Sequence, residues 1–447
     1  EPVDGRNFRA RQGVKGRVGP GPFHKAGEKG RNGFPLPAFV TLPRMSARPA
    51  PAPADASLID SRTAAWRLLV TVLLVTLGNS AMYVVSVVLP AVQAEFGIGR
   101  AGASMPYTVM MVCLGLGGLF TGIWADRWGI ARVLWLGSAA VLAGYVLAAL
   151  SDGLLGLLGG AATFAPLMAD TGLWWNKRRG IAMAVCASGN YIAGTLWPPL
   201  AQWGITHYGW RPTYIVLGLV CGIGMALLAF YMRQRPPALA LPAAGAAAAP
   251  RATIWPPDRP FGLSTAHAQW LLCVAGVACC VAMSMPQVHI VAYCTDLGYG
   301  AARGAEMLSL MLFSGIVSRL VSGWICDHIG GIRTLLLGSA LQGVALLMFL
   351  PADGLVPLYV VSALFGLFQG GIVPSYAIIV REHFPTQEAG ARTGAVMMAS
   401  LVGMALGGWM SGWVFDVTGS YQAAFFNGIA WNLLNLSIAG WLFWRVR

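Results

Sequence analysis

Charged side chains are scarce in this sequence. Asp, Glu, Lys and Arg make up 11% of its 447 residues, whereas a soluble domain has about 25%. The hydrophobic residue types make up 56%. A chain with so few charges cannot cover a water-exposed surface, so this composition excludes an ordinary soluble protein and indicates a membrane protein.

Signals for catalysis and for metal binding are also missing. The eight cysteines lie almost entirely within apolar runs, and none has metal-ligand spacing. No phosphate-binding loop, metal cluster or nucleophile constellation can be read from the chain. The sequence therefore predicts no enzyme, no resident metal and no cofactor. No apolar run precedes residue 66, so no signal peptide is predicted either.

Apolar runs long enough to cross a bilayer are what the sequence does have. A helix of about 20 residues spans the roughly 30 Å hydrocarbon core. Lipid offers backbone groups no hydrogen-bond partners, and these runs are too long for barrel strands. We therefore predict an all-α membrane protein with twelve transmembrane helices. The predicted runs are 66–94, 102–125, 130–150, 153–176, 180–204, 211–232, 267–295, 302–327, 331–351, 355–380, 390–415 and 420–445.

A repeated segment divides these helices into two groups of six. GIWADRWGIARVLWLGSA begins at Gly122, and GWICDHIGGIRTLLLGSA begins 201 residues later, at Gly323. A repeat of that period predicts two similar halves, residues 61–232 and 267–447. The Pro- and Ala-rich residues 233–266 between them are predicted to be a cytoplasmic linker.

Positive charge lies mostly on one side of the predicted membrane. The loops on the side of the N-terminus hold twelve Lys and Arg, and the opposite loops hold three, Arg100, Arg211 and Arg303. By the positive-inside rule, both termini are predicted to be cytoplasmic. We expect the protein to lie in the inner membrane of a bacterium and to work as a monomer.

Residues 1–60 are predicted to be a disordered N-terminal extension. Residues 1–44 carry nine Lys and Arg against three Asp and Glu and show no apolar periodicity. Met45 opens an ordinary short tail, so we expect residues 1–44 to be upstream sequence translated in frame. The net charge of +13 comes from this lead and from the positive-inside bias, and it predicts no nucleic-acid partner.

The first repeated segment resembles a motif of the major facilitator superfamily, G-x-x-x-D-R-x-G-x-x-R. The matching residues are Gly122, Asp126, Arg127, Gly129 and Arg132, and a weaker second copy has Asp327, His328 and Arg333. The resemblance implies alternating access between two halves, with these residues as a latch at the cytoplasmic ends of helices two and eight. Glycine also permits a tight turn there. The alternative is that the charges only follow the positive-inside bias.

One charge lies deep inside a predicted helix. Arg319 precedes Asp327 by eight residues, which places it roughly 12 Å inside the cytoplasmic end of helix eight. A charge near the midplane costs about 2.5–3.5 kcal/mol, and a guanidinium fork matches a carboxylate. We therefore predict an anion site at Arg319. The alternative is a structural role, with Arg319 bonded to carbonyl groups or paired with Asp170.

The second half resembles the superfamily branch that carries oxalate, formate, lactate and other monocarboxylates. The stretches FQGGIVPSYAIIVREHFPTQEAGARTG, RRGIAMAVCASGN and LWPPL carry this resemblance. It implies that Arg319 binds a carboxylate with Tyr376 and Tyr107 nearby. Two departures limit it. Helix eleven lacks the Lys of the oxalate exchangers, and Gly315 stands where the lactate carriers have an Asp, so their proton relay cannot be transferred.

Other polar residues of the helices complete the predicted site. Asn79, Tyr83 and Asn190 lie on helices expected to line a central cavity and can supply hydrogen bonds. Because Arg does not release its proton, proton coupling needs another group, and Asp170 and His289 are the candidates. Asp170 can equally pair with a neighbouring basic residue, and His289 can be a satisfied core histidine.

The sequence thus predicts a secondary active transporter that moves a small organic monocarboxylate by alternating access. Its partners would be the acid, protons or a counter-anion, and the lipid bilayer. One alternative is a drug/proton antiporter of the same superfamily, which the positive sign of the lone midplane charge disfavours. The other is a non-transporting membrane sensor, which should need an output domain.

Overall fold

The computed structural model describes residues 61–151, 179–233, 255–257, 259–385 and 388–447. All of them belong to one compact unit that spans residues 52–447. Within this part the chain is helical, and it contains no strand. Nine segments of the described part are long and apolar enough to cross a membrane. The all-α membrane fold predicted from the sequence is confirmed.

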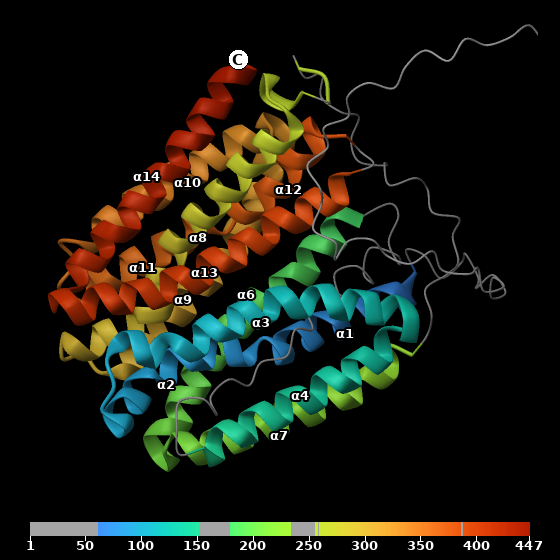
Figure 1. Cartoon of the computed structure of the whole chain (residues 1–447). Coiled ribbons are helices and arrows are strands. Elements are labelled where there is room, and N and C mark those ends of the chain that lie inside the picture. Colours follow the sequence, from blue (N-terminus) through green and yellow to red (C-terminus); the bar gives the residue numbers. More distant parts are fainter. Residues whose placement is uncertain (1–60, 152–178, 234–254, 258, 386–387) are drawn as a thin grey trace, which may run out of the picture. The chain divides into compact units, whose positions relative to one another are not determined.

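The helices follow the predicted runs closely (Figure 1). The first half has α1 (Arg62–Gly78), α2 (Ser80–Phe96), α3 (Arg100–Trp128), α4 (Ile130–Leu150), α6 (Arg179–Tyr208) and α7 (Trp210–Tyr231). The second half has the short 3-10 helix η4 (Pro260–Gly262), α8 (Thr265–Asp296), α9 (Ala301–Ile329), α10 (Gly331–Phe349), α11 (Leu355–Gln369), α12 (Ile372–His383), α13 (Ala389–Thr418) and α14 (Tyr421–Val446). The predicted run 153–176 lies outside the described residues.

Two of the predicted spans are broken into two helices each. Asn79 separates α1 from α2, and its Nδ2 donates to the Val75 carbonyl at 2.8 Å. Gly370 and Gly371 separate α11 from α12. A Cβ atom at Gly370 would lie 2.6 Å from the carbonyl oxygen of Gly315 on α9. Discontinuous helices of this kind are typical of transporter binding sites.

The glycines of the repeated segment form the same turn in both halves. Gly129 joins α3 to α4 with φ 86° and ψ 150°, and Gly330 joins α9 to α10 with φ 89° and ψ 166°. Only glycine adopts this backbone conformation without strain. The tight turn predicted from the repeat is therefore confirmed at both positions.

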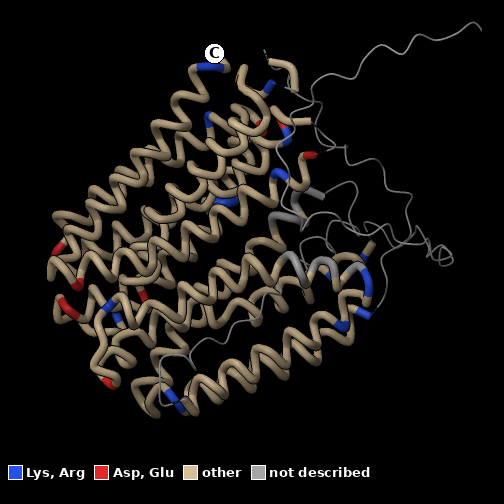
Figure 2. The backbone as a smooth tube through the Cα atoms, viewed as in Figure 1, with Lys and Arg blue, Asp and Glu red and all other residues tan. Residues whose placement is uncertain are grey.

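The three Arg residues counted on the side opposite the N-terminus all form ion pairs. We call this side the outer end; it holds the α2–α3, α8–α9 and α13–α14 turns. Figure 2 shows Lys, Arg, Asp and Glu mostly near the ends of the helices, with long uncharged stretches between them. The pairs are Arg100 with Asp296, Arg211 with Glu95 and Arg303 with Glu306.

Helices of the two halves pack in two antiparallel pairs, α3 with α13 and α6 with α9. In the second pair Ser309 of α9 donates to the carbonyl of Thr195 on α6. Gly194 allows this approach, because a Cβ atom there would lie 2.1 Å from Leu312 Cδ1. Small residues at such seams bring helix backbones close together in membranes.

Replacing Gly366 with Ala should destabilise the fold. Its Cβ atom would lie 1.8 Å from the Met311 carbonyl oxygen, so α11 and α9 must separate. Overpacking of this kind costs about 1–3 kcal/mol, and we expect a lower apparent melting temperature of the detergent-purified protein. Gly440→Ala is the control, since a Cβ atom there meets only Leu336 at 3.9 Å. Equal melting temperatures for the two variants would contradict this packing.

Candidate functional site

Arg319 lies on α9 where that helix packs against α6. Its Nη1 donates to the carbonyl of Ala187 at 3.1 Å. Its guanidinium carbon lies 4.5 Å from the centre of the Tyr191 ring. Its Nε is buried, and no described residue accepts a hydrogen bond from it. No described carboxylate forms an ion pair with Arg319, and the predicted alternative partner Asp170 lies outside the described residues.

Three buried tyrosines from the first half lie at the contact between the halves, and two of them, Tyr191 and Tyr83, lie near Arg319. They are Tyr83 on α2, Tyr107 on α3 and Tyr191 on α6. The Tyr83 hydroxyl lies close enough to interact with Tyr191, Arg319 and the Asn190 amide. Tyr107 is 2% exposed, and its hydroxyl has no partner among the described residues.

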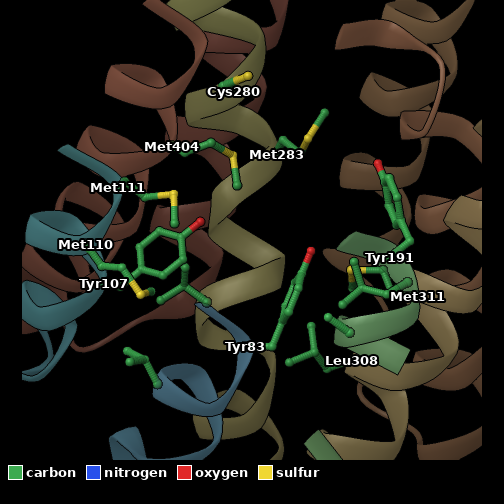
Figure 3. Close-up of a cluster of buried hydrophobic side chains, with 14 of the residues drawn as sticks. Tyr83, Tyr107, Met110, Met111, Tyr191, Cys280, Met283, Leu308, Met311 and Met404 are labelled. Atoms are coloured by element: carbon green, nitrogen blue, oxygen red, sulfur yellow. The ribbon is translucent and has the colours of Figure 1, made fainter. Parts of the chain in front are cut away.

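Sulfur-containing and aliphatic side chains surround these rings, as Figure 3 shows. They come from both halves: Met110 and Met111 on α3, Cys280 and Met283 on α8, Leu308 and Met311 on α9, and Met404 on α13. Such side chains are apolar and adaptable in shape. The cluster is therefore an apolar environment with one cation and several hydroxyl groups, and it lies across the seam between the halves.

The structure brings together four of the six predicted substrate-site residues. Tyr83 lies near Arg319 and Asn190, and Tyr107 lies near Tyr83. Tyr376 is engaged elsewhere, because its hydroxyl donates to Asn435 Oδ1 at 2.8 Å. That bond lies wholly within the second half, between α12 and α14.

The remaining predicted hydrogen-bonding residue, Asn79, is used by its own helix. Its Nδ2 bonds to the Val75 carbonyl at the break between α1 and α2. The break itself is tied to α6, because Trp197 Nε1 donates to the Thr76 carbonyl at 2.8 Å. Asn79 therefore shapes the span that carries Tyr83, and its Nδ2 is occupied by this local bond.

His289 is the one proton-coupling candidate that the structure describes. Its ring is fully buried on α8, and its Nε2 donates to the Gly408 carbonyl on α13 at 2.8 Å. Its Nδ1 has no partner among the described residues. Asp170, the other candidate, lies outside them. The bond to Gly408 fits the structural alternative and leaves one ring nitrogen available.

The predicted latch residues lie near the Gly129 and Gly330 turns. Arg127, Arg132, Asp327 and Arg333 are all at least partly exposed. Arg333 lies over the ring of Phe443, with its guanidinium carbon 5.8 Å from the ring centre. The surroundings of Gly122 and the side chain of Asp126 lie outside the described part of the chain. The latch function, including the role of Asp126, therefore stays a prediction.

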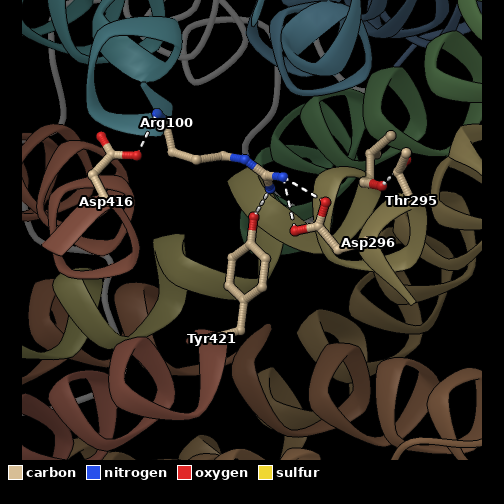
Figure 4. Close-up of polar contacts among 6 residues, drawn as sticks. Arg100, Thr295, Asp296, Asp416 and Tyr421 are labelled. Carbon is tan, nitrogen blue, oxygen red and sulfur yellow. Dashed lines mark hydrogen bonds and ion pairs between the residues drawn. The ribbon is translucent and has the colours of Figure 1, made fainter. Parts of the chain in front are cut away.

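A cluster at the outer end was not expected from the sequence, although Arg100 was counted there as a loop charge. Arg100 Nη2 donates to both carboxylate oxygens of Asp296, at 2.6 and 2.7 Å. Its Nη1 donates to the Tyr421 hydroxyl. Asp416 accepts hydrogen bonds from the backbone N–H groups of Arg100 at 2.7 Å and Ala101 at 2.8 Å. Figure 4 shows Arg100 with Asp296, Asp416 and Tyr421.

Tyr191 is the other residue that sequence reasoning missed. It is adjacent in sequence to Asn190, but a tyrosine in an apolar helix has no distinctive pattern. Only the antiparallel packing of α6 on α9 places it over Arg319.

Comparisons with known proteins point to one family. The model of the Major Facilitator Superfamily matches residues 68–359 and 333–447. Among curated relatives, rat monocarboxylate transporter 13 is 32% identical over 286 residues, 62% of this chain and 62% of that protein. Mouse monocarboxylate transporter 4 is 26% identical over 359 residues, 76% of this chain and 75% of that protein. The chain thus spans less than two thirds of the length of the first of these relatives.

Solved structures agree on the fold. A crystal structure of a mutant of the peptide transporter POT in complex with alafosfalin has a TM-score of 0.65 at 13% identity, with 85% of this chain and 95% of that chain covered. A bacterial homologue of the human lysosomal transporter Spinster, inward-facing and occupied, has a TM-score of 0.60 at 14% identity, with 86% and 97% covered. At such identities the likeness shows the fold alone.

Tyr376→Phe should lower the melting temperature, whereas Tyr107→Phe should not. The first change leaves the buried Asn435 Oδ1 without its donor, which costs about 1–3 kcal/mol. The second removes a hydroxyl that has no described partner. Thermal unfolding of both detergent-purified variants beside the wild type provides the measurement. A larger loss for Tyr107→Phe would contradict the assignment of these two hydroxyl groups.

Proposed function

The chain belongs to the major facilitator superfamily, and from that membership we propose that it moves a small organic monocarboxylate across a membrane by alternating access. It is a membrane transport protein by family. The carried acid, the coupling ion and the residues that bind them are the parts proposed here.

The observation that carries the proposal is the environment of Arg319. A cation within a membrane span costs about 2.5–3.5 kcal/mol, and no described carboxylate offsets that cost. The Ala187 carbonyl and the Tyr191 ring satisfy only part of the guanidinium. A bound carboxylate supplies the missing charge and two acceptor oxygens. Because the described cluster contains one cation, it suits a monoanion better than a dianion.

The relatives support the same substrate class. The rat and mouse proteins compared above are named monocarboxylate transporters, and so are several others at similar identity. A drug/proton antiporter would need an acidic group to select a cation. Among the residues whose side chains the structure describes, no Asp or Glu is buried.

We propose that transport of the acid is coupled either to protons, by symport, or to a counter-anion, by exchange. Arg319 cannot act as the proton carrier. His289 has one ring nitrogen without a described partner, which makes it the described candidate, and Asp170 is the other. From the distribution of Lys and Arg we propose that both termini are cytoplasmic. The bacterial inner membrane and the monomeric state remain predictions.

Uptake into proteoliposomes tests this function. The panel is formate, lactate, pyruvate, 2-hydroxyisobutyrate and oxalate, with and without an inward proton gradient. We expect one monocarboxylic acid to accumulate, and Arg319→Ala to lose roughly 100-fold in kcat/KM, because a charge-assisted bidentate contact of about 3 kcal/mol disappears. Arg319→Lys is the matched control that keeps the charge and loses the planar fork.

The dependence on the gradient separates the two coupling modes. Accumulation driven by the proton gradient indicates symport, and uptake only into vesicles preloaded with an acid indicates exchange. Full uptake of an acid by folded Arg319→Ala would contradict the site. Failure of every acid, together with transport of a cationic dye, would favour the antiporter.

A further inference from the structure

We infer that Tyr191 is a positioning residue that holds Arg319 so that its Nε–Nη2 edge is free to bind the carboxylate. This inference rests on the function proposed above and adds the atoms that bind the acid. It also assigns a role to Gly315, the residue one turn before Arg319 on α9.

The contacts of the guanidinium leave one edge without a described hydrogen-bond partner. Nη1 is occupied by the Ala187 carbonyl at 3.1 Å, and one face is covered by the Tyr191 ring at 4.5 Å. Nε is buried and has no hydrogen-bond partner among the described residues, and the one hydrogen bond from the Arg319 side chain to a described residue is that of Nη1. The N–H bonds of Nε and Nη2 run parallel, which is the side-on geometry that matches the two oxygens of a carboxylate.

Gly315 makes the position of the Tyr191 ring possible. A Cβ atom at residue 315 would lie 2.5 Å from Tyr191 Cε1 and 2.7 Å from its Cδ1. The ring therefore occupies the space that any side chain at 315 would need. One turn further along α9, the same ring meets the guanidinium. The Tyr191 ring thus packs against Gly315 and Arg319 at the same time.

Neutral partners hold the cation without cancelling its charge. An acidic side chain at position 315 would pair with Arg319 and compete with the substrate for it. An aromatic face and a backbone carbonyl restrain the guanidinium and leave its full positive charge. The site is therefore ready for a carboxylate anion without prior protonation of an acidic partner.

Three variants test the positioning role: Tyr191→Phe, Tyr191→Leu and Gly315→Ala, assayed by KM and kcat for the acid that the wild type transports. Phe keeps the ring, so KM should stay within about twofold of the wild type. Leu removes the aromatic face, and a cation–π contact of about 1.4 kcal/mol corresponds to about a tenfold rise in KM, with kcat changed less. Gly315→Ala pushes the ring away and should raise KM in the same direction.

The Arg319→Lys background supplies the decisive comparison. A lysine lacks the Nε–Nη2 edge, so Tyr191→Leu should add little to its KM. An unchanged KM in Tyr191→Leu, with uptake still dependent on Arg319, would overturn the positioning role and leave the proposed function intact. Tyr191 would have a purely structural role if both Tyr191→Leu and Tyr191→Phe lowered kcat and the melting temperature without raising KM. That result would also overturn the positioning role. Loss of Arg319 dependence would overturn both.

We also infer, from separate observations, that Arg100 locks the outer end of the protein shut. Arg100 belongs to the first half, but its side chain is 8% exposed and its partners Asp296 and Tyr421 belong to the second. The guanidinium carbon also lies 4.7 Å from the centre of the Phe415 ring. The charge is thus buried among residues of the other half.

Asp416 ties the backbone of α3 to the same place. Its carboxylate accepts from the first N–H groups of α3, where the helix dipole favours an anion. A Cβ atom at Gly99 would lie 2.6 Å from Asp416 Oδ2, and one at Gly412 would lie 2.8 Å from the Ala101 nitrogen. Glycines at both positions allow α3 and α13 to meet here.

The seam between α3 and α13 is closed for several turns from this cluster. Gly115 on α3 still meets Met398 on α13, since a Cβ atom there would lie 2.6 Å from its sulfur. Further from the outer end on α13, a Cβ atom at Gly390 or Gly394 would meet nothing within 4 Å. Opening the outer end must therefore break the contacts of Arg100, and the lock favours the state seen here.

Labelling of Cys280 from outside tests the lock. Cys280 is buried in the central cluster, and a protein that retains it as its single cysteine reacts with an impermeant maleimide only when the outer end opens. We expect Arg100→Ala and Asp296→Ala each to raise the labelling rate about tenfold, as loss of a coupling of about 1.4 kcal/mol would, and the double variant to add little. Arg303→Ala is the control, because the Arg303–Glu306 pair lies within α9.

A variant in which Arg100 and Asp296 exchange their charges distinguishes loss of the lock from misfolding. Arg100→Asp combined with Asp296→Arg should restore a labelling rate near that of the parent protein. Equal rates for Arg100→Ala, Arg303→Ala and the parent would overturn the lock. So would independent, multiplying effects of Arg100→Ala and Asp296→Ala, since a shared contact requires coupling.

Discussion

A partly buried guanidinium that lies between two helices without a described carboxylate partner constrains the centre of this protein. Arg319 needs acceptors, and in the described part it has one carbonyl and one aromatic face. Both come from α6, one turn apart, so the contacts of one cation help to hold α6 against α9, together with the Ser309–Thr195 bond and the close approach at Gly194. Gly315 follows from the same constraint, because the ring that covers Arg319 fills the space beside it.

Close backbone contact around α9 extends this constraint through the second half. Gly366 brings α11 against the Met311 carbonyl, and Gly370 brings the break between α11 and α12 against the Gly315 carbonyl. Lipid provides no hydrophobic force between helices, so close packing of this kind is what holds them together. The break between α11 and α12 therefore lies at the helix that carries the cation, where a site needs irregular backbone and precise distances.

The sequence predicts the parts of this arrangement that depend on local patterns. Apolar runs predict the helices, the repeat predicts the turns at Gly129 and Gly330, and a lone charge in an apolar run identifies Arg319. Tyr191 could not be found in this way, because its importance depends on which residue of α9 lies opposite. The pairing of Arg100 with Asp296 joins residues 196 positions apart, and the sequence shows each of them only as a charge near a loop. Tyr376 was suggested by resemblance, yet its hydroxyl bonds to Asn435, a partner that no sequence pattern identifies.

Arg319 and Tyr191 lie on different halves, and this has a consequence for transport. A ligand shifts an equilibrium between two states only as far as its affinity differs between them. When the halves move, the face of Tyr191 and the carbonyl of Ala187 move relative to Arg319, so the orientation of the carboxylate-binding edge depends on the state. In the proposed function, an acid at that edge therefore contacts the boundary between the halves, which shifts during transport. Under the proposed function, neutral contacts across the seam thus give the single fixed cation an affinity for its anion that differs between the two states, which is what allows the anion to shift the equilibrium between them.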